Sequence, residues 1–495
     1  MDSPHTSDTR RYWTAHALCA LVALVALWTV RYLPMVDLPQ HAAQIYLWQH
    51  YDDPADGIAR DHVLNWFTPY LGGYLLVRLA AFGLPLLQAI KLVVTLAALA
   101  FPLSLHRLLR ETGGDRWWSL LGYPMAFGFS FYWGFLNYLV ALPVGMLFLV
   151  AALRFAREPT WRRAGAFAAF GLLLCLCHVL VFTVVGAAAG FLVLEGCRNV
   201  RGALLRMGPF LPGVLFSGAW ARLTYGSVGD VREEGWWNFR PLHRVLELPA
   251  MLLGNESDTQ AAVVGGLLLL AVVLSAKLKL APLRWLAALA LVLAHLLGPH
   301  RAFGTSFLGE RFAVFALPAL LLVLTTASPR PWHRVLRTGL TLTALGWLAV
   351  LLLRFQSFDA DARGFDDISA RMEPHRRALS LNFLLETPYT FVPSPSFLHF
   401  LAWYQTEKGG RVGRSFAEYF PQLVRFRPGM KPRMTHDLDW FPQRFRWEND
   451  GDYDYFVVRA PEDLGPRLFA SATEPVRLVA RSGVWWLYQR EPRTP

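Results

Sequence analysis

Charged residues are scarce in this chain of 495 residues: only 17% are Asp, Glu, Lys or Arg, whereas 54% are hydrophobic. Ordinary soluble domains carry about 25% charged residues, so this composition argues for lipid as the main solvent. Cysteines are few as well, and all lie in or beside apolar runs: Cys19, Cys175, Cys177 and Cys197. They predict no disulfide framework and are explained as small apolar core residues.

Several catalytic signatures are absent: the chain has no Walker loop, dinucleotide fingerprint, zinc-ligand spacing or hydrolase elbow. The formal charge of +12 does suggest a basic surface. However, the part from Phe358 onward holds 19 Lys and Arg against 18 Asp and Glu, so the excess lies in the apolar part. Basic loops held in the cytoplasm explain this distribution, and it argues against nucleic-acid binding.

Apolar runs of spanning length, about 17–25 residues, recur along residues 1–357. The stretch 164–195 is too long for one simple span, and we expect two short helices that turn near His178. With them, the sequence predicts about eleven membrane helices, the others at 12–33, 86–106, 117–132, 134–153, 203–222, 260–276, 281–298, 311–328 and 333–354.

The loops between these helices sort by charge. Five of them are rich in Arg or Lys: 107–116, 154–163, 198–206, 277–279 and 330–337. If all five are cytoplasmic, the N-terminus is inside and the last helix exits outward. The sequence then predicts a multi-pass transmembrane domain, 1–357, with an extracytoplasmic loop, 34–85, and an extracytoplasmic C-terminal domain, 358–495. Within the loop, 66–84 is interpreted as an interfacial or re-entrant segment, because a crossing there would invert the earlier loops.

The C-terminal part has the pattern of an α/β domain. A helical stretch near 361–377 precedes a strand-like segment, 378–383, and a second strand is expected at 455–459. Residues 476–481 and 484–490 flank Ser-Gly, which is a hairpin signal.

Two polar residues follow the first expected helix directly. Asp37 opens an amphipathic segment, and His41 lies one turn later on the same face. A carboxylate beside an imidazole at a membrane surface suits a general base. The same pattern also fits a helix cap, since Asp37 with Gln40 resembles a capping box and Pro39 suits a first turn. Both interpretations stay open.

Arg311 and His178 are further candidates on the same predicted face. An Arg where a helix enters lipid is costly unless it is paired or faces a cavity, and its planar fork suits phosphate. The alternatives are a snorkelling side chain or a structural pair with Glu310. His178 interrupts an apolar run, and such a histidine is often purely structural.

Aromatic and polar residues in the loop 223–259 could contact a sugar or acceptor, or could anchor the protein among lipid headgroups: Trp236, Trp237, Arg240 and His243.

In the tail, His399 and Tyr404 precede Glu407. Asp437 and Asp439 form a two-acid spacing that leaves a divalent metal open, although such a spacing also fits a solvated turn.

Taken with this layout, the chain resembles the GT-C superfamily of integral-membrane glycosyltransferases. That family places an essential Asp directly after the first helix, where Asp37 stands, and a basic residue before an apolar, Pro-containing run, as in Arg311 to Pro318. A C-terminal α/β outer domain is common in it. Many members have a second acid beside the first, but position 38 is Leu here. Metal use and a non-catalytic relative therefore both stay open.

The resemblance implies transfer of a sugar from a polyprenyl-phosphate donor to a glycan, lipid or protein acceptor of the envelope, with inversion. Asp37 would be the general base, and Arg311, His41 and His178 would bind the donor phosphate. No cofactor is implied beyond the open divalent metal. The alternative from another class is a transporter or non-enzymatic component of polysaccharide or lipid export in the inner membrane.

The predicted sidedness is directly testable. A cysteine introduced into the C-terminal part should react with a membrane-impermeant thiol reagent added to the outer face of intact inner membranes. Labelling only from the cytoplasmic face would contradict the topology.

Overall fold

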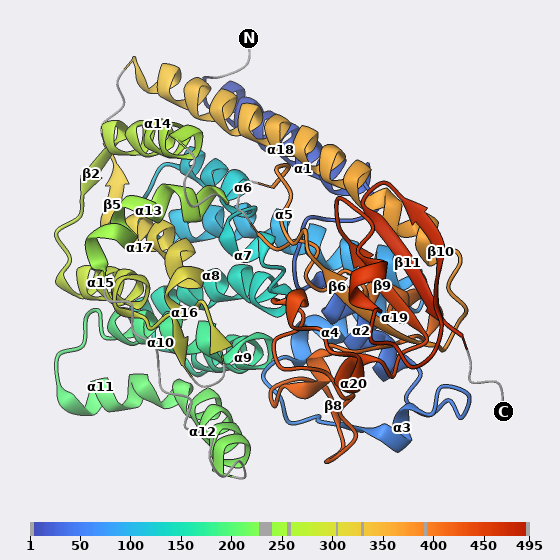
Figure 1. Ribbon diagram of the computed structural model, residues 1–495. Helices are drawn as coiled ribbons and strands as arrows, with labels where there is room; N and C mark the ends of the chain where they lie inside the picture. The colour runs from blue at the N-terminus through green and yellow to red at the C-terminus, as the bar shows by residue number, and fades with distance from the viewer. Residues whose placement is uncertain are drawn as a thin grey trace.

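The computed structural model describes residues 4–226, 240–254, 259–302, 305–327, 331–390 and 394–491 (Figure 1). It is rich in helices. Trp236 and Trp237, two of the predicted acceptor contacts, lie outside the described residues.

Four of the described helices are long and apolar enough to cross a membrane: α1 (Pro4–Trp28), α5 (Leu86–Thr112), α8 (Leu136–Arg157) and α18 (His333–Ser369). Shorter apolar helices accompany them: α4 (Leu71–Ala80), α10 (Val179–Val193), α14 (Thr259–Ser275) and α15 (Pro282–Leu297). The chain is thus an integral membrane protein, as its composition predicts, while the count of eleven crossings stays a prediction.

The expected pair of helices within 164–195 is confirmed. Helix α9 (Trp161–Cys177) ends at His178, whose extended backbone (φ −168°, ψ 109°) separates it from α10. Further helices of this part of the chain are α2 (Leu38–Gln49), α3 (Ile58–Asp61), α11 (Val200–Met207), η2 (Gly208–Phe210), α12 (Leu211–Gly226) and α13 (Pro241–Leu253).

Two expected spans are broken into short pieces. The segment 117–132 forms η1 (Arg116–Leu121), α6 (Gly122–Met125) and α7 (Phe129–Tyr132). The break occurs at Gly128, where a Cβ would lie 2.8 Å from the carbonyl oxygens of Met251 and Leu252. The backbone of α13 therefore packs so closely here that position 128 has no room for a side chain. Likewise 311–328 forms α16 (Leu308–Arg311), η3 (Phe312–Phe315), α17 (Ala316–Val323) and β5 (Leu324–Thr326).

Helix α18 is continuous through residue 357. The sequence instead predicts a domain boundary there and a separate helix from 361. Its apolar face explains the difference. Phe355, Phe358, Ala362 and Phe365 recur at helical spacing and are all 0% exposed. The same buried face therefore continues from the membrane part into the tail.

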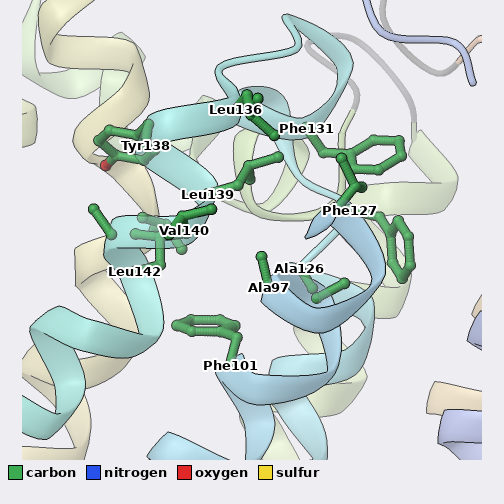
Figure 2. Packing of buried hydrophobic residues seen from close by; sticks show 14 of the residues in the cluster. Ala97, Phe101, Ala126, Phe127, Phe131, Leu136, Tyr138, Leu139, Val140 and Leu142 are labelled. Carbon is green, nitrogen blue, oxygen red and sulfur yellow. The ribbon is translucent and has the colours of Figure 1, made fainter. Parts of the chain in front are cut away.

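Helices α1 and α18 lie side by side along one edge of the molecule (Figure 1). Where α1 ends, the buried Asp359 of α18 accepts hydrogen bonds from the backbone N–H groups of Arg31 (2.7 Å) and Tyr32 (2.8 Å). The Tyr32 hydroxyl also donates to Asp366 of α18 (2.6 Å). Figure 2 shows the adjoining core, in which side chains of α5, of the broken segment 126–131 and of α8 pack together.

The tail contains a five-stranded mixed sheet in the order β10-β11-β9-β6-β7. Its strands are β6 (Arg377–Asn382), β7 (Arg411–Val412), β9 (Tyr455–Arg459), β10 (Val476–Ser482) and β11 (Trp485–Arg490). Strands β10 and β11 form the expected hairpin at Gly483, and β6 pairs in parallel with β9. Short helices surround the sheet: α19 (Ala402–Lys408), η4 (Phe416–Glu418), η5 (Pro442–Arg444), α20 (Trp447–Asp450) and α21 (Gly465–Leu468).

The tail and the loop after α1 are joined through the backbone. Strand β1 (His62–Leu64) pairs antiparallel with β8 (Val424–Phe426). Two buried glutamines of α2 extend this contact. The Gln40 amide donates to the Arg414 carbonyl and accepts from the Phe416 N–H, both at 2.9 Å, and Gln44 makes the equivalent pair with Val424. Two further two-stranded pairs are β2 (Ala276–Leu278) with β5 and β3 (Arg301–Ala302) with β4 (Thr305–Ser306).

The substitution Asp359→Ala should destabilise the protein by about 2–4 kcal/mol, because it removes a charged acceptor and leaves two backbone N–H groups without one. Thermal unfolding of the purified protein in detergent measures the effect. Glu158→Ala is the control, because Glu158 is 67% exposed in a surface ion pair with Arg163. Equal melting of the two variants would contradict the role of Asp359.

Candidate active site

A cavity of about 230 Å³ lies where the apolar helices meet the tail. Four of the residues predicted from the sequence line it together: Asp37, His41, His178 and Arg311. The tail contributes His399, Arg414, Phe416, Tyr419, Gln422 and Trp440 to the opposite wall. Residues from both ends of the chain thus meet in one cavity.

The position of Asp37 is fixed through its backbone. The Val36 and Asp37 N–H groups donate to the carbonyls of Tyr132 and Trp133, at 2.9 and 3.1 Å. The chain can approach so closely only because Gly134 follows: its φ is +77°, and a Cβ there would lie 2.7 Å from the Asp37 nitrogen.

The carboxylate of Asp37 is not used to cap the helix that it precedes. Asp37 is the N-cap residue of α2, with Pro39 in the first turn, but its side chain makes no capping hydrogen bond. Gln40 bonds to the tail rather than back to residue 37. The capping-box interpretation is therefore wrong, because tertiary contacts take up the groups that it would need.

The surroundings of Asp37 set its basicity. Its side chain is only 15% exposed, and Oδ1 lies 3.5 Å from Nε2 of His399. Burial raises the pKa of Asp37 to about 7, and the charges of Arg311 and Arg414 act in the opposite direction. A carboxyl group with this pKa is suited to general-base chemistry near neutral pH.

Arg311 is buried beside this carboxylate. Its guanidinium donates to the backbone carbonyls of Ser306 (2.7 Å) and Phe307 (3.2 Å), and it lies 4.0 Å from the ring centroid of Phe135. The predicted pair with Glu310 does not form, because Glu310 contacts His300 (2.7 Å) and Arg244 (3.9 Å) instead. In the described part of the chain, no carboxylate lies within 4.0 Å of Arg311, which leaves its charge available to an anion in the cavity.

The two predicted histidines differ in surroundings. His41 Nδ1 bonds with the Tyr74 hydroxyl (2.8 Å), which donates to Gln422 of the tail (2.6 Å). Burial lowers the pKa of His41 to about 3, so this ring offers a hydrogen bond but no charge. His178 is 1% exposed between the rings of Tyr70 and Tyr138.

Five buried polar atoms that belong to cavity-lining residues have no hydrogen-bond partner within the described ranges: Trp133 Nε1, Asn137 Nδ2, His178 Nδ1, His399 Nδ1 and Arg414 Nε. An unpaired buried polar group costs about 1–3 kcal/mol. Five such groups around one cavity point to a polar ligand that completes their bonds.

Sequence reasoning missed two tail residues beside Asp37. His399 was noted only as one of several tail residues, and Arg414 was not singled out. Arg414 lies 3.4 Å from Asp439 and 3.5 Å from Glu418, and its Nη2 donates to the Tyr419 hydroxyl (2.5 Å). Neither residue has a local motif, since the fold alone brings them to α2.

The remaining candidates lie elsewhere. Arg240 precedes α13, and His243 pairs with Glu247 (2.9 Å); neither lines the cavity. Asp437 pairs with His436 (2.9 Å), while Arg414 supplies positive charge to Asp439. Among the described side chains, these two aspartates form no three-ligand metal cluster.

No protein-family model and no curated protein matches the chain. Two solved structures do resemble it over nearly the whole length. ArnT from Cupriavidus metallidurans in the apo state has a TM-score of 0.54 at 13% identity, covering 98% of both chains. The same protein bound to undecaprenyl phosphate has a TM-score of 0.50 at 12% identity, covering 97% of this chain and 98% of ArnT.

The chain thus shares the fold of ArnT over nearly its whole length.

Proposed function

We propose that this protein is a GT-C glycosyltransferase that moves a sugar from a polyprenyl-phosphate donor to an envelope acceptor at the outer face of the inner membrane. One observation carries the proposal. Asp37 presents an uncapped carboxylate with a pKa near 7 to a buried cavity that also contains Arg311. In one cavity, Asp37 can accept the proton of an attacking hydroxyl while Arg311 stabilises the departing phosphate, and a single displacement needs both groups.

In this mechanism Asp37 accepts the proton of an acceptor hydroxyl. The acceptor oxygen then forms a bond to the anomeric carbon from one face of the sugar. The bond between that carbon and the phosphate oxygen breaks on the other face, so the configuration inverts. The polyprenyl phosphate leaves with the bonding electrons, and the guanidinium of Arg311 stabilises its charge.

The unpaired donors divide the cavity between the two substrates. Asn137 of α8, His178 between α9 and α10, and Arg311 of α16 all precede the tail. We assign them with His41 to the donor phosphate. His399 and Arg414 come from the tail, so the acceptor approaches from that side. His399 is a positioning residue: it orients Asp37, and its own pKa of about 3, lowered by burial, keeps it uncharged.

The fold supports a lipid-linked donor, since ArnT, which shares it, has been crystallised with undecaprenyl phosphate. The distribution of basic loops supports the proposed sidedness, in which the tail and the cavity lie outside. A non-enzymatic export component would need neither a basic Asp37 nor turnover, so activity measurements separate the two functions.

Asp37→Asn should reduce sugar transfer by about 10²–10⁴-fold, which is the usual contribution of general-base catalysis, because the amide cannot accept the proton. The measurement is transfer from a defined polyprenyl-phosphate sugar by purified protein. Asp52→Asn is the control, since Asp52 is exposed in the same loop. Wild-type turnover in Asp37→Asn with an unchanged melting temperature would discard Asp37 as the base.

The pH dependence should report Asp37. Activity requires its ionised form, so kcat/KM should fall as the pH drops below about 7. Arg414→Gln removes a nearby positive charge that favours this form, so the acid limb should move to higher pH. The exposed Arg433→Gln is the control and should leave the limb in place. An unshifted limb in Arg414→Gln would show that another group titrates.

A further inference from the structure

A second cluster of titratable groups lies at the other end of α2. His50, Asp53 and Asp56 each offer one ligand atom, and these atoms all lie within 4.8 Å of one another. His50 Nδ1 is 3.2 Å from Asp56 Oδ2. Its ring is stacked on Tyr46, with centroids 4.3 Å apart, which fixes the direction of Nδ1.

The tail adds an outer partner to this cluster. His375 Nδ1 lies 2.9 Å from Asp56 Oδ1, the carboxylate oxygen that does not face His50. His375 precedes β6, more than 300 residues along the chain from His50. Its N–H bonds to the carbonyl of Lys408, which anchors the backbone so that the imidazole reaches across the junction.

Asp56 needs a positive charge that the described side chains do not supply permanently. Its side chain is only 5% exposed, and its ion-pair partners are the two histidines alone. The nearby Arg411 is directed elsewhere: it pairs with Asp61 (3.0 Å) and donates to the Asp56 backbone carbonyl (3.4 Å). A buried carboxylate without a cation is costly.

We propose that His50, Asp53 and Asp56 bind one Zn²⁺, and that His375 fastens this site to the tail through the second carboxylate oxygen of Asp56. One imidazole nitrogen and two carboxylate oxygens suit tetrahedral Zn²⁺, with water as the fourth ligand. The imidazole of His50 argues against Mg²⁺ and Ca²⁺, which prefer oxygen ligands throughout. Tyr46 donates its hydroxyl to Asp56 (3.1 Å) and orients that ligand from outside the site.

The site is structural. Helix α2 has twelve residues, so its two ends are about 18 Å apart at 1.5 Å per residue. Asp37 stands at one end and the metal at the other. A bound ion therefore fixes the far end of the helix that carries the base, and takes no part in sugar transfer. This inference does not rest on the proposed function.

The test uses the full-length protein, purified in detergent through a tag without histidines, stripped with chelator and dialysed against limiting Zn²⁺. Elemental analysis should find one Zn²⁺ per chain, and Zn²⁺ should raise the melting temperature by several degrees. His50→Gln and His375→Gln should each weaken Zn²⁺ binding at least tenfold and abolish the thermal shift. Co²⁺ in its place should give the absorption of a tetrahedral centre.

His436→Gln is the matched control, because His436 is 90% exposed beside Asp437 and should leave Zn²⁺ binding unchanged. His375 is itself 54% exposed, so its replacement should preserve the fold, which circular dichroism checks. Wild-type protein that retains no Zn²⁺ and shows no thermal shift would overturn the proposal. Equal Zn²⁺ binding in the wild type and both histidine variants would do the same.

Discussion

Helix α2 is held between two parts of the chain by hydrogen bonds to the backbone, and the geometry of the cavity depends on them. The turn at Tyr132 and Trp133 fixes its beginning, while Gln40 and Gln44 bind the tail as strand-like partners. Because these bonds involve backbone and amide groups, the carboxylate of Asp37 is not needed to hold the helix in place. A side chain with no structural partner can keep a raised pKa and react.

The sequence predicts site residues best where a polar side chain interrupts or borders an apolar run. The basic loops predict that Asp37, His41, His178 and Arg311 lie on one face of the membrane, and in the structure all four line the same cavity. The helix break at His178 and the β10–β11 hairpin followed from run length and from turn residues. These features depend on local patterns or on the cost of charge in lipid, and both can be read without knowledge of the packing.

Other features depend on contacts between distant segments. The pattern at Asp37 and Gln40 fits a cap as well as a docking face, and only the tail decides between them. His399 and Arg414 carry no motif, yet they set the surroundings of Asp37. The sequence does not predict that α18 is unbroken, because the acidic residues around Asp359 resemble the end of a membrane span. In the structure, Asp359 and Asp366 accept hydrogen bonds from Arg31 and Tyr32, just after α1.

The continuity of α18 has a mechanical consequence. Its 37 residues extend about 55 Å, of which about 30 Å suffices for the hydrocarbon layer. The remainder continues as a rigid helix that packs against β10 and β11, and so holds the sheet at a set distance from the hydrocarbon layer. In the proposed reaction, an acceptor whose hydroxyl lies far from the lipid surface would therefore have to bend toward the bilayer.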